Sequence, residues 1–68
     1  MKLTYHEKSD LLYIRLDERR QQVLCKEPSD GVVLELGEED HIVGIEILDA
    51  SKRLRLDQLL TLEYRKTA

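Results

Sequence analysis

Four polar side chains lie at positions where they could carry acid–base chemistry. Glu35 and Glu46 are each flanked by apolar residues, and Tyr13 and Arg15 occupy alternate positions of one apolar segment. Two carboxylates held close together raise the pKa of one of them, as a general acid requires. The same residues also suit a cross-strand ion pair on the polar part of a sheet, which is the interpretation we favour. No catalytic residue is therefore assigned.

The densest group of potential metal ligands is Glu38, Glu39, Asp40 and His41. A hard cation needs several oxygens that converge from a loop, whereas four consecutive residues of a hairpin tip splay outward. We therefore expect a solvated turn and no metal or cofactor. Cys25 is the single cysteine, so it forms no intrachain disulfide, and neither histidine gives it a recognisable catalytic signature. A lone thiol favours a reducing, cytoplasmic location.

Alternation of apolar and polar residues predicts five short strands, at residues 2–6, 11–16, 22–26, 32–36 and 41–48. Residues 27–31 predict a break, because Pro28 removes a donor and Asp-Gly favours a turn. Connections of about four residues favour antiparallel hairpins over parallel crossovers. The prediction is one small domain over residues 1–68, built as an α+β antiparallel meander.

A short helix should follow the last strand. Asp49 and Ser51 are both good N-cap residues, and good helix formers come after them. We expect a helix near residues 49–55 and a helical turn near 57–60. Residues 61–65 alternate again, so periodicity leaves helix and strand open for 59–66.

Alternation also sorts the strand residues onto two faces of the sheet. The first face is wholly apolar, and the C-terminal helix is expected to pack on it through Leu54, Leu56, Leu59 and Leu60. Its members are Leu12, Ile14, Leu16, Val32, Leu34, Leu36, Val43, Ile45 and Ile47. The second face mixes apolar residues with Arg15, Glu35 and Glu46.

One helix covers only one face, so the second face would leave an apolar patch near the upper limit for a soluble monomer. Two-fold association is the commonest way to bury such a patch. We therefore expect a homodimer, with Gly44 allowing close approach of the facing chain. The alternative is that residues 59–64 fold back and cover this face within one chain. The candidate interface consists of Leu11, Tyr13, Val33, Ile42, Gly44 and Leu48.

The charge distribution argues against nucleic acid as a partner. Residues 1–51 carry 6 basic and 12 acidic groups, while residues 52–68 carry 5 and 2. The whole chain has net charge −3 and pI about 5.3, the opposite of the basic footprint of nucleic-acid binders. No apolar run is long enough to cross a membrane. An acidic body suits a basic protein partner.

Three segments resemble a known family: LLYIRL after Asp10, GVVLEL at residues 31–36 and VGIEILDASKRL at residues 43–54. They are similar to small prokaryotic proteins known only as domain of unknown function number twenty-two eighty-three. The resemblance covers roughly residues 1–54, with His6 where many relatives have Asp. It implies a small β-meander with a C-terminal helix, and it carries over no activity and no catalytic residue.

These observations favour an uncharacterised small cytoplasmic protein that acts as a self-associating protein–protein interaction module. A subtype is an acidic partner that neutralises a small basic protein. The alternative is a small enzyme or ligand-binding domain that uses Tyr13, Arg15, Glu35 and Glu46 on the sheet face.

Overall fold

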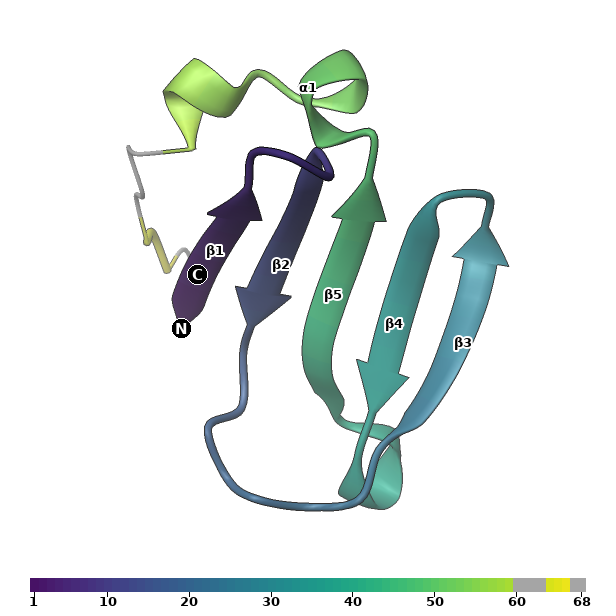
Figure 1. Cartoon of the computed structure of the whole chain (residues 1–68). Helices are drawn as coiled ribbons and strands as arrows, with labels where there is room; N and C mark the ends of the chain where they lie inside the picture. The colour runs from purple at the N-terminus through teal and green to yellow at the C-terminus, as the bar shows by residue number, and fades with distance from the viewer. Residues whose placement is uncertain (60–63, 67–68) are drawn as a thin grey trace.

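The computed structural model, which describes residues 1–59 and 64–66, contains five antiparallel strands in one sheet (Figure 1). This confirms the predicted α+β class. The strands are β1 (Lys2–His6), β2 (Leu11–Arg15), β3 (Leu24–Ser29), β4 (Val32–Leu36) and β5 (Ile42–Leu48). Their order across the sheet is β1-β2-β5-β4-β3, and the β2–β3 connection runs along the end of the sheet (Figure 1).

The last strand, β5, therefore lies between β2 and β4, where a strict meander would leave it at an edge. β5 is the longest strand, and it holds two of the most buried positions of the sheet, Val43 and Gly44. A mostly apolar strand gains most in the centre, where both of its edges are paired. The shorter β1 and the wholly exposed β3 form the two edges. This order brings β2 and β4 to opposite sides of the same strand.

β3 differs from its prediction. It was expected at residues 22–26 with a break from residue 27, but it runs over Leu24–Ser29 and includes Pro28. An edge strand tolerates proline, because a missing N–H on its outer side breaks no ladder bond. The register with β4 is also irregular between Lys26 and Ser29, so the strand accommodates Pro28 at that point.

The C-terminal elements are shorter than predicted. The helix α1 spans Ala50–Arg53, and the 3-10 turn η2 spans Leu56–Gln58. Asp49 has φ 53°, so the helix begins only after it, and Leu54 is extended and ends the helix. Residues 64–66 form neither helix nor strand, and the expectations for Leu60 and residues 61–63 lie outside the described residues.

The strand register confirms the first face for seven of its nine predicted residues, while Leu16 lies outside the strands and Val43 has no paired residue. On one side of β5, Ile47 pairs with Leu12 and Ile45 pairs with Ile14. On the other side, Ile47 pairs with Val32 and Ile45 pairs with Leu34. Directly paired residues share a face, so these side chains form one apolar surface. Leu3 and Tyr5 of β1 extend it, because they pair with Ile14 and Leu12.

A bulge corrects the placement of Ile42. From Glu35 to Leu36 of β4, the partner on β5 changes from Gly44 to Ile42, so Val43 is an extra residue. An extra residue shifts the alternation of side chains by one position, so the pattern that assigned Ile42 to the second face does not apply there. The register places Ile42 opposite Leu36, which belongs to the first face.

In the part of the chain that the structure describes, one layer of sheet has little cover from the helical segments. In the described part of the chain, the fully buried apolar residues are Leu12, Val43 and Ala50. Neither α1 nor η2 packs extensively on a strand, and both lie at the end of the sheet where β1 and β2 turn (Figure 1). Within the described residues, the predicted cover of the first face is represented by Leu56 and Leu59. They line a half-open cavity of about 240 Å³ together with Leu3, Tyr5 and Leu12.

Candidate functional site

The second face brings the four candidate polar residues into two adjacent rows, two in each row. Arg15 pairs with Gly44, which in turn pairs with Glu35, and Tyr13 pairs with Glu46 in the next row. The Tyr13 hydroxyl reaches diagonally across β5 and donates a 2.6 Å hydrogen bond to Oε1 of Glu35. Sequence reasoning placed these residues on one face, but the Tyr13–Glu35 contact depends on a strand order that alternation does not encode.

Tyr13 is held as a hydrogen-bond donor. The Glu35 carboxylate raises its pKa above the ordinary value of 10.0, partial burial raises it further, and nearby Arg15 opposes the shift. A phenol with a raised pKa is neutral at physiological pH, so it is a poor base and a poor nucleophile. The arrangement supports the structural interpretation of this cluster over a catalytic one.

The predicted ion pair between Arg15 and a neighbouring carboxylate is wrong. The Arg15 guanidinium instead donates to two backbone carbonyls of the following loop, through Nε to Asp17 at 2.8 Å and through Nη2 to Arg19 at 3.3 Å. Arg19 forms an ion pair with Asp17 at 2.9 Å. This ion pair is local, and the guanidinium of Arg15 serves to fix the start of the β2–β3 connection.

Gly44 is buried beneath side chains of its own chain. A Cβ at this position would collide with the Glu35 carboxylate and would lie 2.6 Å from the Tyr13 hydroxyl. The glycine was expected to let a facing chain come close. Its open space is instead filled by Tyr13 and Glu35, which leaves no room there for another backbone.

The remaining residues of the candidate interface occupy the second face as expected from the register. Leu11 pairs with Leu48, and Val33 pairs with Glu46. Leu48 is exposed, whereas Leu11, Tyr13 and Val33 are half-buried. With Ile42 opposite Leu36 and Gly44 covered, this surface is smaller than the sequence indicated.

A second polar cluster, which sequence reasoning did not find, ties the β1–β2 turn to α1. Asp10 accepts hydrogen bonds through Oδ1 from the Tyr5 hydroxyl at 2.7 Å and the Ser51 N–H at 2.9 Å. Its Oδ2 accepts from Ser51 Oγ at 2.6 Å, and its carbonyl accepts from the Ala50 N–H at 3.0 Å. The Ser51 hydroxyl, followed by Tyr5, holds the pKa of Asp10 below its ordinary value.

Asp10 thus acts as the N-cap side chain of a helix that begins 40 residues later in the chain. Asp49 occupies the N-cap position but makes no side-chain cap, so the local prediction identified the helix start and missed the capping group.

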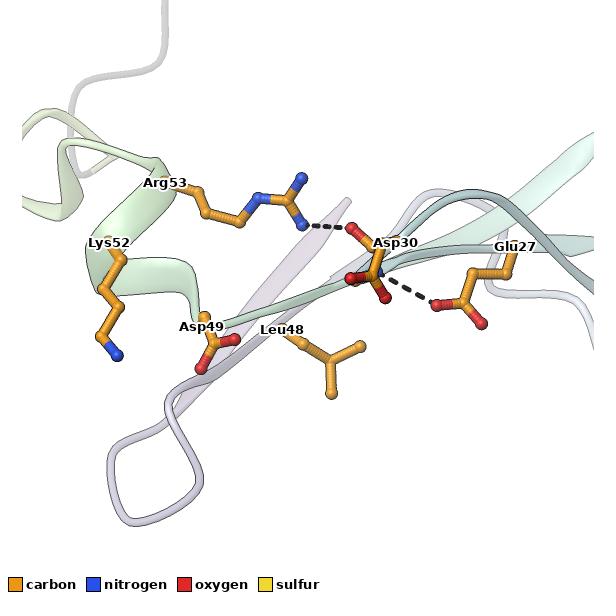
Figure 2. Close-up of a pocket in the computed structure, with 7 residues that line it drawn as sticks. Glu27, Asp30, Leu48, Asp49, Lys52 and Arg53 are labelled. Carbon is orange, nitrogen blue, oxygen red and sulfur yellow. Dashed lines mark hydrogen bonds between the residues drawn. The ribbon is translucent and has the colours of Figure 1, made fainter.

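A polar groove lies between α1 and the β3–β4 turn (Figure 2). Arg53 Nη1 donates to the Asp30 carbonyl at 2.8 Å, and the Gly31 N–H donates to Glu27 Oε2 at 3.1 Å. Gly31 has φ 82°, and a Cβ there would collide with the Arg53 guanidinium. The groove lining has groups of both signs, so its charge favours neither anions nor cations. The lining residues are Glu27, Asp30, Gly31, Leu48, Asp49, Lys52 and Arg53.

The acidic loop forms a 3-10 turn, η1, over Glu38–Asp40, and its side chains are exposed. Gln21 Oε1 accepts a hydrogen bond from the Glu38 N–H at 3.0 Å, which fixes the turn to the β2–β3 connection. Across residues 1–59 and 64–66, no three metal-ligating side chains gather in one place. None of the helices in this part of the chain has the length and apolar character needed to span a bilayer.

The chain belongs to the family described as protein of unknown function DUF2283, whose model matches residues 2–51. A relative from Methanosarcina mazei, named "Putative hypoxanthine phosphoribosyltransferase", is 49% identical over 37 residues. The match spans 52% of this chain and only 30% of that relative. No solved structure matches the chain at a significant level.

Proposed function

We propose that this protein is a small protein–protein interaction module that works as a homodimer. The observation that carries the proposal is the small core of the single-layer sheet: Leu12 and Val43 on the strands and Ala50 of α1 are the fully buried apolar residues of the described chain. Stable domains normally pack two layers around one core, because each sheet must bury an apolar face. A second copy supplies the missing layer without any further element in the chain.

The charge supports a basic protein as the further partner of the dimer. Residues 1–51 carry 6 basic and 12 acidic groups, and complementary charge speeds encounter and selects partners. Cys25 is exposed and free, which suits a reducing, cytoplasmic compartment. A small basic protein of that compartment is the partner class that we propose.

An enzymatic function has less support. The activity in the name of the Methanosarcina relative belongs to a protein of which this chain matches under a third. This chain has three glycines and no glycine-rich phosphate loop. Tyr13, Arg15, Glu35 and Glu46 line neither the cavity at Leu56 and Leu59 nor the groove beside α1, and Tyr13 is held neutral.

Multi-angle light scattering at tens of micromolar tests the proposal. We expect a mass of about 16 kDa, twice that of the 8.0 kDa chain. The mass should not fall in high salt, because burial of apolar surface is not screened as surface charge pairs are. A mass near 8.0 kDa at low and high salt would overturn the proposal.

A further inference from the structure

We infer that two copies meet through the first face, stacking their sheets into a two-layer β-sandwich. The inference rests on the proposed self-association and specifies its surface. Sequence reasoning favoured the second face, because the C-terminal helix was expected to cover the first. Among residues 1–59 and 64–66, Leu56 and Leu59 are the C-terminal side chains that line the cavity beside β1 and β2, and neither α1 nor η2 packs extensively on a strand, so the described structure gives little reason to prefer the second face.

Exposure is concentrated on the first face. Leu3 and Tyr5 are each 40% exposed and Leu24 is 61% exposed, and their partners Ile14, Leu12 and Leu36 all belong to that face. Ile42, opposite Leu36, is 43% exposed. On the second face, Leu48 is the large apolar strand residue with a similar exposure. Large apolar side chains left in water mark a surface that another molecule covers.

The two faces also differ in the charged residues that they carry. Between β1 and β3, the first face has one charged strand residue, Lys26, at the outer edge opposite Leu34. The second face carries Arg15, Glu35 and Glu46 near its centre. A two-fold contact there would remove these charged groups from water, which costs free energy unless each finds a well-placed partner.

The first face fits a copy of itself better than any other occupant. A two-fold interface must be self-complementary, and a nearly uncharged apolar sheet meets this condition without specific charge pairing. Two such sheets pack about 10 Å apart and interdigitate their side chains, as in other β-sandwiches. Ile14, Ile45 and Ile47, which are half-buried in one chain, would then lie between the layers.

Single lysine substitutions on opposite faces test the inference. Leu3→Lys on the first face and Leu48→Lys on the second are matched, because the two leucines are 40% and 41% exposed on strands of the same sheet. Leu24→Lys adds a first-face site on β3, away from Leu56 and Leu59. Scattering mass gives the oligomeric state, and circular dichroism shows whether each variant keeps its sheet.

We expect Leu3→Lys and Leu24→Lys to weaken dimerisation at least tenfold, whereas Leu48→Lys keeps the wild-type mass. If Leu48→Lys alone dissociates the dimer, the first-face inference is overturned while self-association stands. A monomeric wild type overturns both. If Leu3→Lys loses its sheet, Leu24→Lys decides, because its side chain is the most exposed of the strand leucines and contributes least to the fold of one chain.

Discussion

The Tyr13 hydroxyl donates a 2.6 Å hydrogen bond to the Glu35 carboxylate directly over Gly44. The two side chains come from β2 and β4, which are not neighbours, so the bond spans the central strand β5. It is possible only because the central residue at that point has no side chain. Gly44 therefore serves the internal packing of the second face.

Gly44→Ala should destabilise the protein by about 1–3 kcal/mol. The new Cβ would displace Glu35 and Tyr13, which breaks their hydrogen bond and overpacks the second face. Chemical denaturation measures the loss. Glu46→Ala, also on the second face, is the control and should stay within about 0.5 kcal/mol of wild type. An unchanged midpoint for Gly44→Ala would show that the Tyr13–Glu35 bond is absent.

The same bond makes stability sensitive to alkaline pH. Folding raises the pKa of Tyr13 above 10.0, so its stabilising contribution is complete below about pH 10. This contribution to the free energy of unfolding is lost as pH rises through the raised pKa, because the phenol ionises more readily in the unfolded state than in the folded state. Tyr13→Phe should cost about 1–2 kcal/mol at neutral pH and should flatten this alkaline loss.

Denaturation midpoints between about pH 8 and pH 11 measure this difference. Glu35→Gln is the matched control, because an amide oxygen still accepts the bond while the carboxylate charge is gone. An alkaline loss of the same size in wild type and Tyr13→Phe would assign the effect to other groups, among them Tyr5, whose pKa Asp10 also raises.

The sequence was sufficient for local structure and for the first face. Alternation located β1 and β4 at their observed ends, and the partners of Leu12, Ile14 and Ile45 lie on the predicted face. Period two depends on neighbouring residues only, so it works wherever a strand is regular. It failed at Ile42, where the extra residue Val43 interrupts the alternation.

Features that join distant residues were not predictable in this way. Nothing in the spacing of apolar residues indicates that β5 inserts between β2 and β4, on which the Tyr13–Glu35 bond depends. The Asp10–Ser51 cap joins residues 41 positions apart, whereas the local pattern pointed to Asp49 or Ser51 as the capping residue. A strand that includes Pro28 could be predicted only if β3 were known to be an edge strand.

Asp10→Asn should loosen the attachment of α1. Asparagine tolerates the left-handed backbone at this residue, where φ is 53°, so the substitution tests the carboxylate rather than the turn. The amide group cannot accept from both Ser51 N–H and Ser51 Oγ as the carboxylate does. We expect faster hydrogen exchange at the Ser51 amide and a lower melting temperature, and equal exchange in both proteins would contradict the cap.

The acid side gives a second readout of the same contact. Folding lowers the pKa of Asp10 below 3.8. The ionised side chain therefore stabilises the fold above about pH 4, and this stabilisation is lost as pH falls through the lowered pKa. Asp10→Asn should therefore be less stable than wild type at neutral pH, and the difference should shrink as both proteins are acidified. A constant difference at all pH values would show that Asp10 is not ionised in this contact.

Ile45→Ala tests whether the first face is the core of the functional molecule. Ile45 lies on the central strand between Ile14 and Leu34, and it is half-buried in one chain. If a second copy covers this face, the substitution leaves a cavity between two layers and should destabilise by about 2–5 kcal/mol. The wild-type unfolding midpoint should also rise with protein concentration, because unfolding then separates two chains. Each tenfold increase in concentration should add about 1.4 kcal/mol per dimer. A loss below about 0.5 kcal/mol, with a midpoint independent of concentration, would place Ile45 on a free surface and remove the physical basis for the dimer.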